Sequence, residues 1–358
     1  MNILFLPSNI ASIPSITANA LNKIEGIHAK NVNDSRHKYQ SENSNSILLP
    51  NKFYSRLRPF KRLRLKYQYR RELKKWIKWA DVLHYVFNPA YKNGKDLKWA
   101  KDQNKIIIIE WLGSDIRDPE VLFKINPHYR KAFNNGYEYK NAEESQNKNK
   151  VQRLFAKARA IPFVYPELSL FLNKTLFPKY FLASQRLVLS DFAPHYPSLN
   201  NHCPLIVHSP TAKIAKGTNL ILPVIEELKK EYDFKFVLLH DISREEALEI
   251  MQNADIFLDQ IICGGYGMAC TEAMAFGKPV VCYIMPEVFD AGLPRDFPVV
   301  NTNPDNLKEQ LIKLITSPLL RHDIGKQSRA YAEKHFDANK IALQLLEIYK
   351  DALDKKNQ

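Results

Sequence analysis

The chain has 358 residues, a length that predicts two domains rather than one core. Hydrophobic residues make up 45% and charged residues 25%, which is typical of a globular protein. No apolar run approaches the ~20 residues that a membrane-spanning helix needs. The first residues show no pattern of a signal peptide, and the four cysteines show neither metal-ligand spacing nor a disulfide framework. We therefore expect a cytoplasmic protein with reduced thiols.

The net charge of +14 is unevenly distributed along the chain. Residues 1–200 hold 34 Lys and Arg against 16 Asp and Glu, whereas residues 201–358 hold 18 against 22. Within 56–78, eleven basic residues and one acidic residue are interleaved with leucines and aromatic residues. This pattern suits an anionic lipid surface, and it would also suit nucleic acid or a solvated helix face. The expected membrane patch is Arg62, Arg64, Lys66, Arg70 and Arg71.

Apolar runs rich in β-branched residues alternate with helical patterns, which predicts an α/β fold with parallel sheets. In chain order, the expected strands are 3–6, 82–86, 106–111, 187–189, 205–208, 234–239, 256–259, 279–284 and 299–300. The polar stretches 37–48 and 135–150 are expected to be mobile excursions. A segment around 195–204 contains prolines and no periodic pattern, so it marks the domain boundary.

This boundary predicts an N-terminal domain over 1–200 and a C-terminal domain over 204–337. Ser243, followed three residues later by Glu246, predicts the start of a helix. Gly277 predicts the end of a helix that begins near Met268. The last amphipathic pattern, 338–358, has one apolar face, which we expect to pack back onto the first domain.

The segment 254–284 is the most informative part of the chain. A strand ends at Asp259, a loop with Gly264, Gly265 and Gly267 follows, and a helix begins near Met268. Open parallel sheets bind ligands beyond the carboxyl ends of their strands, and the first N–H groups of a helix attract anions. Such a site suits a diphosphate. Glu272, one turn inside the helix, suits sugar hydroxyls.

The run GGYGMACTEAMAFGKPVV within this segment resembles the donor-site signature of retaining GT-B glycosyltransferases (family 4-like, group 1), a large bacterial family. The resemblance implies two Rossmann-like domains facing across a cleft. It also implies that Glu272 binds the ribose of the nucleotide. The loop residues implied at the donor site are Gly264, Gly265, Tyr266, Gly267 and Met268.

One position departs from the family pattern, because Gly264 stands where the first of two glutamates contacts the transferred sugar in the family. This departure leaves the identity of the donor sugar open. Asp259 and Gln260 resemble a bacterial branch of the family that also lacks this glutamate. The resemblance implies that glycine in place of this glutamate is a feature of that branch.

Two further segments resemble elements of the same family. Lys216, in a Lys-Gly pair before a long helix, resembles the lysine that neutralises the donor diphosphate and is the implied catalytic residue. Thr211 stands where the family usually has an arginine, five residues earlier, so either Lys213 substitutes for that arginine or a single cation suffices. In the first half, Asp115 either orients an acceptor hydroxyl or caps the following helix. The other residues implied on the acceptor side are Ser8, Asn9, Gly113 and Ser114.

The resemblance implies an enzyme that moves a sugar, with retention of configuration, from a nucleotide diphosphate sugar to a glycan or lipid-linked acceptor. It implies the synthesis of a bacterial surface polysaccharide such as capsule or lipopolysaccharide, at the inner face of the cytoplasmic membrane. No metal and no other cofactor are expected, and nucleic acid is not an expected partner. Gly264 motivates an alternative, a sugar-nucleotide epimerase or a donor-binding pseudoenzyme on the same fold. The charge of the first half motivates another, a nucleic-acid-binding protein.

Overall fold

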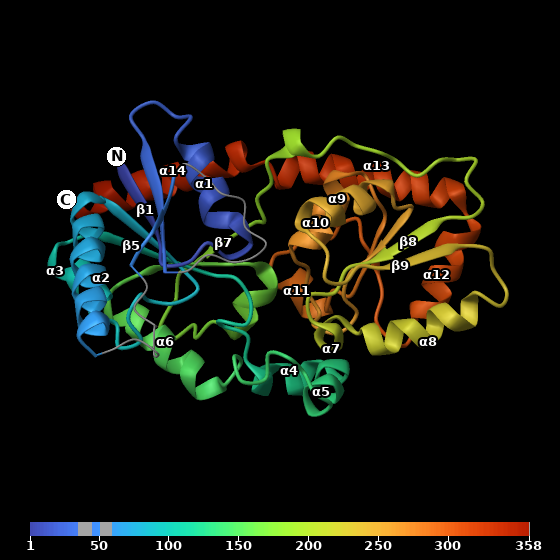
Figure 1. The fold of residues 1–358 in the computed structure, drawn as a ribbon, viewed down its shortest axis with the longest axis horizontal. Helices are drawn as coiled ribbons and strands as arrows, with labels where there is room; N and C mark the ends of the chain where they lie inside the picture. The colour runs from blue at the N-terminus through green and yellow to red at the C-terminus, as the bar shows by residue number, and fades with distance from the viewer. Residues whose placement is uncertain (35–44, 51–58, 358) are drawn as a thin grey trace. The chain divides into compact units, whose positions relative to one another are not determined.

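A computed structural model describes residues 1–34, 45–50 and 59–357, and they form two compact units (Figure 1). The first unit contains Met1–Arg117, Gln146–Arg186 and Ala338–Gln358, and the second contains Asp118–Ser145 and Leu187–Asp337. The division therefore differs from a single boundary near residue 200. Residues 118–145 and 187–200 belong to the second unit, although the sequence places them in the first domain.

The first unit is built on a seven-stranded sheet with the order β3-β2-β1-β4-β5-β6-β7, in which all pairs are parallel. Its central strands are buried along their whole length because both faces of a parallel sheet are covered. The strands are β1 (Asn2–Leu6), β2 (His28–Asn33), β3 (Ser46–Leu48), β4 (Val82–Val86), β5 (Ile106–Trp111), β6 (Ile161–Val164) and β7 (Phe181–Leu182).

The strands expected at 82–86 and 106–111 are confirmed, whereas the strand expected at 187–189 is wrong. Leu187 forms only an isolated bridge with Asp337, and a 3-10 turn, η3 (Leu189–Asp191), follows it. The expectation for 37–48 lies outside the described residues over 37–44. Within the described part, Ser46–Leu48 forms the edge strand β3.

Helices cover the sheet of the first unit. They are α1 (Ile13–Leu21), α2 (Pro59–Trp79), α3 (Lys95–Asp102), α6 (Ser145–Lys157) and α14 (Ala338–Asn357), with 3-10 turns η1 (Ile10–Ser12) and η2 (Pro166–Phe171). The C-terminal helix α14 packs against α1 and β5 (Figure 1). Its apolar face, with Ala342, Leu345 and Tyr349, is buried there. The last segment of the chain is therefore part of the first unit.

The second unit is built on a five-stranded parallel sheet with the order β12-β11-β10-β8-β9. Its strands are β8 (Leu205–His208), β9 (Lys235–Leu238), β10 (Ile256–Leu258), β11 (Val280–Cys282) and β12 (Val300–Asn301). Its helices are α4 (Pro119–Ile125), α5 (Pro127–Asn134), α7 (Lys213–Lys216), α8 (Thr218–Leu228), α9 (Arg244–Asn253), α10 (Met268–Ala275), α11 (Pro286–Asp290), α12 (Leu307–Thr316) and α13 (Pro318–His335).

The helix ends expected in this unit are confirmed. The hydroxyl of Ser243 accepts a hydrogen bond from the backbone N–H of Glu246 at 3.1 Å, at the start of α9. Gly277 has a φ of +75°, the left-handed conformation that ends α10 with little strain only for glycine. Two parallel α/β sheets in two units confirm the expected fold class.

The interpretation of 135–150 as a mobile excursion is wrong. Tyr137 and Glu143 are buried, and the Glu143 carboxylate accepts hydrogen bonds from the hydroxyls of Tyr129 (2.6 Å) and Tyr137 (3.0 Å). The end of the stretch begins α6. Two tyrosine rings therefore give a polar segment enough buried surface to fold. Among the described residues, no helix is both long and apolar enough to cross a membrane.

Candidate functional site

The loop that follows β10 runs from Asp259 to Gly267, and the buried side chain of Gln260 holds it in shape. The Gln260 amide oxygen accepts hydrogen bonds from the backbone N–H groups of Ile262 (2.9 Å) and Cys263 (2.6 Å). Its amide nitrogen donates to the carbonyl oxygens of Gly265 and Tyr283. One side chain thus fixes the loop from inside. Sequence analysis singled out Gln260 only for its resemblance to a branch of the family.

Gly264 is required by the backbone of this loop. Its φ is +78°, and a Cβ atom built there would lie 2.3 Å from Cγ of Met285. Met285 is buried, and its backbone N–H donates to the carbonyl oxygen of Gly264 at 3.1 Å. A glutamate side chain at position 264 would therefore both strain the backbone and displace Met285.

The loop ends at Gly267, the N-cap residue of α10, where no side chain caps the helix. A Cβ atom at Gly267 would have no heavy atom within 4 Å, so the backbone is open at this point. The first N–H groups of α10 thus keep their capacity to bind an anion. Tyr266 is 7% exposed and its ring packs on Phe297, with centroids 4.7 Å apart. Its ring therefore anchors the loop in the core of the second unit.

Lys216, the last residue of α7, reaches the same loop. Its ammonium donates a hydrogen bond to Oδ1 of Asp259, whose side chain is fully buried, while the Lys216 side chain is 20% exposed. Although burial alone would lower the pKa of the Lys216 ammonium, the Asp259 carboxylate raises this pKa above its ordinary value. Gly217 follows with a φ of +83°, and a Cβ there would lie 2.5 Å from Cγ1 of Ile261. At the end of α7, position 216 therefore supplies the ammonium that pairs with Asp259, and position 217 has room only for a glycine.

His208, the last residue of β8, is buried between β10 and α8. Its Nδ1 lies 2.8 Å from the carbonyl oxygen of Leu258, and its Nε2 lies 2.9 Å from the hydroxyl of Thr218. Burial, together with a smaller effect of the nearby Lys216 ammonium, lowers the pKa of His208 to about 4. The imidazole is therefore neutral near pH 7.

Glu272, in α10, forms an ion pair with Arg244, the first residue of α9. The Glu272 side chain is 11% exposed and the Arg244 side chain 39%, so the pair lies at the edge of the site. Burial raises the pKa of the Glu272 carboxyl above its ordinary value, and the Arg244 guanidinium opposes that rise. Sequence analysis missed Arg244. Its place directly after the helix cap Ser243 was the available signal.

A glycine loop, an uncapped helix start, one lysine and one partly exposed glutamate therefore meet in the second unit. Residues 224–331, which include this loop and α10, match the family described as "Glycosyl transferases group 1". Over these 108 residues the chain is therefore similar to group 1 glycosyltransferases. It is also 22% identical over 164 residues to an uncharacterized glycosyltransferase, MJ1178, of Methanocaldococcus jannaschii. That match covers 39% of this chain and 46% of the relative, so the chain matches about half of the relative's length.

Comparison with solved structures shows that the chain has the GT-B fold. Sucrose-phosphate synthase of Thermosynechococcus elongatus is similar over 99% of both chains, with 14% identity and a TM-score of 0.66. WaaG, a glycosyltransferase involved in lipopolysaccharide biosynthesis, is similar over 98% of this chain and 99% of its own, with 13% identity and a TM-score of 0.59. Anabaena Alr3699/HepE, solved in complex with UDP, covers 98% and 100%, with 14% identity and a TM-score of 0.60.

The segment 118–145 contacts the loop and α7 of this candidate site, although it comes from the first half of the chain. The side-chain amide of Asn126 donates to the carbonyl oxygen of Ile262 at 2.8 Å. The Glu138 carboxylate accepts hydrogen bonds from the backbone N–H groups of Ile214 (2.8 Å) and Ala215 (3.0 Å), at the start of α7. Sequence analysis missed these contacts because they join residues about 75 to 135 positions apart. Thr211 and Lys213 are exposed just before Lys216.

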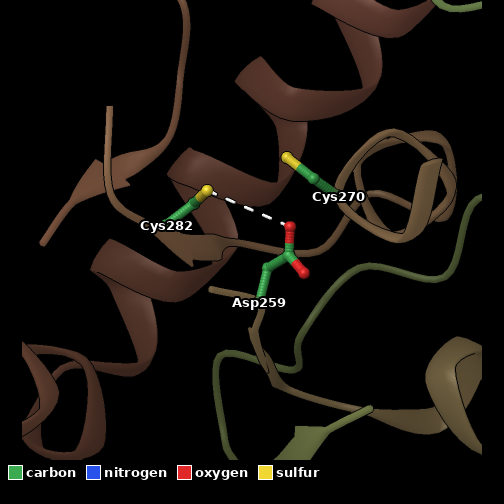
Figure 2. Close-up of side chains that lie close together, drawn as sticks. All are labelled: Asp259, Cys270 and Cys282. Atoms are coloured by element: carbon green, nitrogen blue, oxygen red, sulfur yellow. Dashed lines mark hydrogen bonds between the residues drawn. The ribbon is translucent and has the colours of Figure 1, made fainter. Parts of the chain in front are cut away.

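Asp259 also belongs to a compact group with Cys270 and Cys282 (Figure 2). Among the described residues, these three form one group whose possible ligand atoms lie within 4.8 Å of one another. Burial raises the pKa of the Cys270 thiol well above its ordinary value. The other oxygen of Asp259 accepts a hydrogen bond from the Lys216 ammonium.

In the first unit, Asp115 organises its own loop after β5. Its buried carboxylate accepts hydrogen bonds from the backbone N–H groups of Leu112 (3.1 and 3.0 Å) and Gly113 (2.6 Å). Burial raises the pKa of Asp115 to about 6, and these backbone hydrogen bonds oppose the rise. The expectation that Asp115 caps the following helix is wrong, because Asp118 caps α4 by accepting from Glu120 N–H at 3.0 Å.

The other expected acceptor-side residues lie in the loops after β1 and β5. Asn9 is buried, and its side-chain oxygen accepts a hydrogen bond from the backbone N–H of Ser15 at 3.0 Å. Ser8, before it, is partly exposed. The carbonyl oxygen of Ser114 accepts from the ammonium of Lys148, which comes from α6. These loops lie at the carboxyl edge of the sheet, where open α/β sheets bind ligands.

The expected basic patch lies on α2, and its five members are exposed: Arg62, Arg64, Lys66, Arg70 and Arg71. Three large apolar side chains, Phe60, Leu63 and Tyr67, lie among them with exposed fractions of 89%, 67% and 66%. Their spacing of three and four residues places them on one side of the helix. Farther along α2, Leu73 and Ile77 are buried in the first unit. The first half of α2 is therefore amphipathic without being covered by described residues of the unit.

Proposed function

We propose that the chain transfers a sugar, with retention of configuration, from a nucleotide diphosphate sugar to a glycan or lipid-linked acceptor. The observation that carries the proposal is the Lys216 ammonium beside the open, uncapped start of α10 at the carboxyl ends of β8 and β10. A cation and a helix N-terminus are what a diphosphate requires, both for binding and as a leaving group. The fold similarity to a protein solved with UDP supports this choice of ligand.

The roles of the side chains follow from their places around the loop. Lys216 neutralises the negative charge that grows on the diphosphate as the bond to the sugar breaks. Glu272 accepts hydrogen bonds from ribose hydroxyls, because it lies one turn inside α10 with its side chain 11% exposed. These protein groups supply the positive charge, so we propose a reaction that needs no metal.

We further propose that the acceptor is part of a bacterial surface polysaccharide, such as capsule or lipopolysaccharide. WaaG, which shares the fold, is described as acting in lipopolysaccharide biosynthesis. The basic patch with Phe60, Leu63 and Tyr67 fits an anionic lipid surface, where each engaged Lys or Arg contributes about 1 kcal/mol. The proposed place of action is the inner face of the cytoplasmic membrane, to which the protein would bind peripherally.

The experiment that tests the transfer reaction compares Lys216→Ala with the unchanged protein. After a donor has been found by screening, the release of nucleoside diphosphate and the glycosylated product are both measured. The variant should lose turnover number more than it changes the Michaelis constant, because its charge acts on the transition state. Lys230→Ala, an exposed lysine after α8, is the matched control and should behave as the unchanged protein. An inverted anomeric configuration of the product would contradict the retaining mechanism.

A second candidate function rests on Met285, whose side chain fills the space beside Gly264. If the sugar subsite lacks a group that the transfer requires, the protein is a donor-binding pseudoenzyme or an epimerase of the bound nucleotide sugar. The same assay separates these functions. A pseudoenzyme would bind the donor and leave it unchanged, and an epimerase would convert it without any acceptor.

A further inference from the structure

We infer that Asp259 is a positioning residue, which holds the Lys216 ammonium at the loop before α10. This inference rests on the proposed function, because it gives the mechanism by which the one lysine of the donor site is held in place. Sequence analysis noted Asp259 only as the end of a strand and as a trait of one branch.

The Asp259 carboxylate is held firmly from several sides. The backbone N–H of Asp259 donates to the carbonyl oxygen of Val281 at 2.9 Å, which ties the residue to the neighbouring strand β11. Its Oδ1 accepts from the Lys216 ammonium, and its Oδ2 lies 4.0 Å from Sγ of Cys282 (Figure 2). The position of the Asp259 carboxylate is therefore fixed, and it determines where the Lys216 ammonium lies.

Lys216 is tied to the same loop through its backbone. Its carbonyl oxygen accepts a hydrogen bond from the N–H of Ile261 at 3.2 Å, and Gly217 packs against the Ile261 side chain. The main chain and the ammonium are therefore both fixed relative to β10. A lysine side chain otherwise loses rotamer entropy when it is ordered on a ligand. The ion pair pre-organises the cation before a diphosphate arrives.

Asp259 is also the counter-charge of Lys216. The titratable groups that interact electrostatically with the Lys216 ammonium are Asp259, Cys263, Cys270, Cys282 and His208. Asp259 is the carboxylate of this set, and the His208 imidazole is neutral near pH 7. Because Thr211 stands where the family has an arginine, Lys216 must act without that second cation. A lysine that is largely removed from water needs a fixed anion beside it to remain charged.

The test replaces Asp259 by its isostere in Asp259→Asn and measures the protonation of Lys216 directly. The amine reactivity of Lys216 toward acetic anhydride is followed against pH by peptide mass spectrometry, without any substrate. In the variant, no carboxylate opposes the lowering of the Lys216 pKa by burial. The midpoint of Lys216 reactivity should therefore move to lower pH. The value of kcat/KM should fall about 10- to 100-fold, as expected for loss of a hydrogen bond between charged groups, and most at high pH.

Asp255→Asn is the matched control, because Asp255 is the buried carboxylate at the opposite end of β10 and bonds to Leu205 N–H at 2.8 Å. It should leave the Lys216 midpoint unchanged. Far-ultraviolet circular dichroism verifies that both variants are folded. An unchanged Lys216 midpoint in folded Asp259→Asn would overturn the inference. Absence of donor binding and transfer in the unchanged protein would instead contradict the proposed function, while the labelling midpoint would still decide whether Asp259 holds Lys216.

Discussion

Single residues of the second unit carry most of the chemical argument, and Glu272 is the first to test. Its carboxylate pairs with Arg244 at the edge of the site and is placed to accept ribose hydroxyls. Replacement by alanine removes hydrogen bonds to a charged group, so nucleotide affinity should fall by about 1.5–3 kcal/mol. Isothermal titration with UDP and other nucleoside diphosphates measures the loss. Glu245→Ala, an exposed neighbour of Arg244, is the control, and equal affinities of the two variants would remove Glu272 from the site.

His208 gives a prediction about pH. Its pKa is about 4 in the folded protein and 6.5 in the unfolded chain, so below pH 6.5 the unfolded state binds a proton that the native state does not. Stability should therefore be lost as the pH falls from 6.5 to 4, by up to about 3 kcal/mol from this residue alone. His208→Asn should reduce the slope of unfolding free energy against pH in this window. The exposed histidine variant His240→Asn should retain the slope, and identical slopes for all three proteins would contradict the assignment.

The same residues show what sequence alone could predict of the site. The glycine loop and the start of α10 were predictable from local spacing, whereas the roles proposed for Lys216 and Glu272 came from the resemblance to a family. Asn126 and Glu138 were not predictable, because the tertiary fold brings them to the site from distant segments. The structural reason for glycine at position 264 could not be predicted either. The side chain of Met285, 21 residues further along the chain, occupies the space that a Cβ atom would need.

Among the elements, α14 is an anchor of the first unit. The Tyr349 hydroxyl lies 2.6 Å from Nδ1 of His84, and His84 and Arg186 both pair with the buried Glu110. Tyr349→Phe leaves the buried imidazole without this partner, so the unfolding free energy should fall by about 1–3 kcal/mol. Urea unfolding of the variant and of the unchanged protein measures this loss of unfolding free energy. Leu343→Ala, on the exposed side of the same helix, should change stability by less than about 0.5 kcal/mol. Equal losses in both variants would show that the hydroxyl contributes nothing.

The basic patch of α2 gives the second prediction at this scale. Changing Arg62, Arg64, Lys66, Arg70 and Arg71 to Gln should abolish co-sedimentation with anionic vesicles, since about 1 kcal/mol per engaged cation is lost. The unchanged protein should bind anionic but not zwitterionic vesicles, and 1 M salt should release it because the Debye length shrinks to about 3 Å. The matched control changes five exposed lysines of the second unit, Lys229, Lys230, Lys235, Lys313 and Lys326, to Gln. Equal binding by both variants would show that the patch is only a solvated face.

Elements were predictable where one signal dominated. The apolar strands β4 and β5 and the capped start of α9 matched expectation, whereas β2 and β6 were missed. Strand β2 alternates lysine and asparagine with apolar residues, and β6 contains Pro162, so neither has the composition of a central strand. Pairing with the adjacent strands stabilises both β2 and β6. This pairing cannot be predicted from the residues of each strand alone.

At the scale of the whole molecule, the chain passes between its two units four times rather than once. Residues 118–145 and 187–337 complete the second unit, and α14 returns to the first. A boundary drawn at residue 200 would separate the site from Asn126 and Glu138, which hold its loop and α7. The fold class could be read from alternating strands and helices, but this exchange of segments depends on contacts between residues far apart in sequence.

The central claim is that the intact chain binds a nucleotide diphosphate sugar at the loop before α10. The most direct measurement is thermal unfolding of the full chain with a panel of nucleoside diphosphates and their sugars. At 100 times its dissociation constant, a specific ligand should add about 2.7 kcal/mol of stability. We predict that one nucleoside diphosphate and its sugar raise the melting temperature of the unchanged protein and that Glu272→Ala loses most of this gain. A panel in which no nucleotide stabilises the unchanged protein would contradict the account.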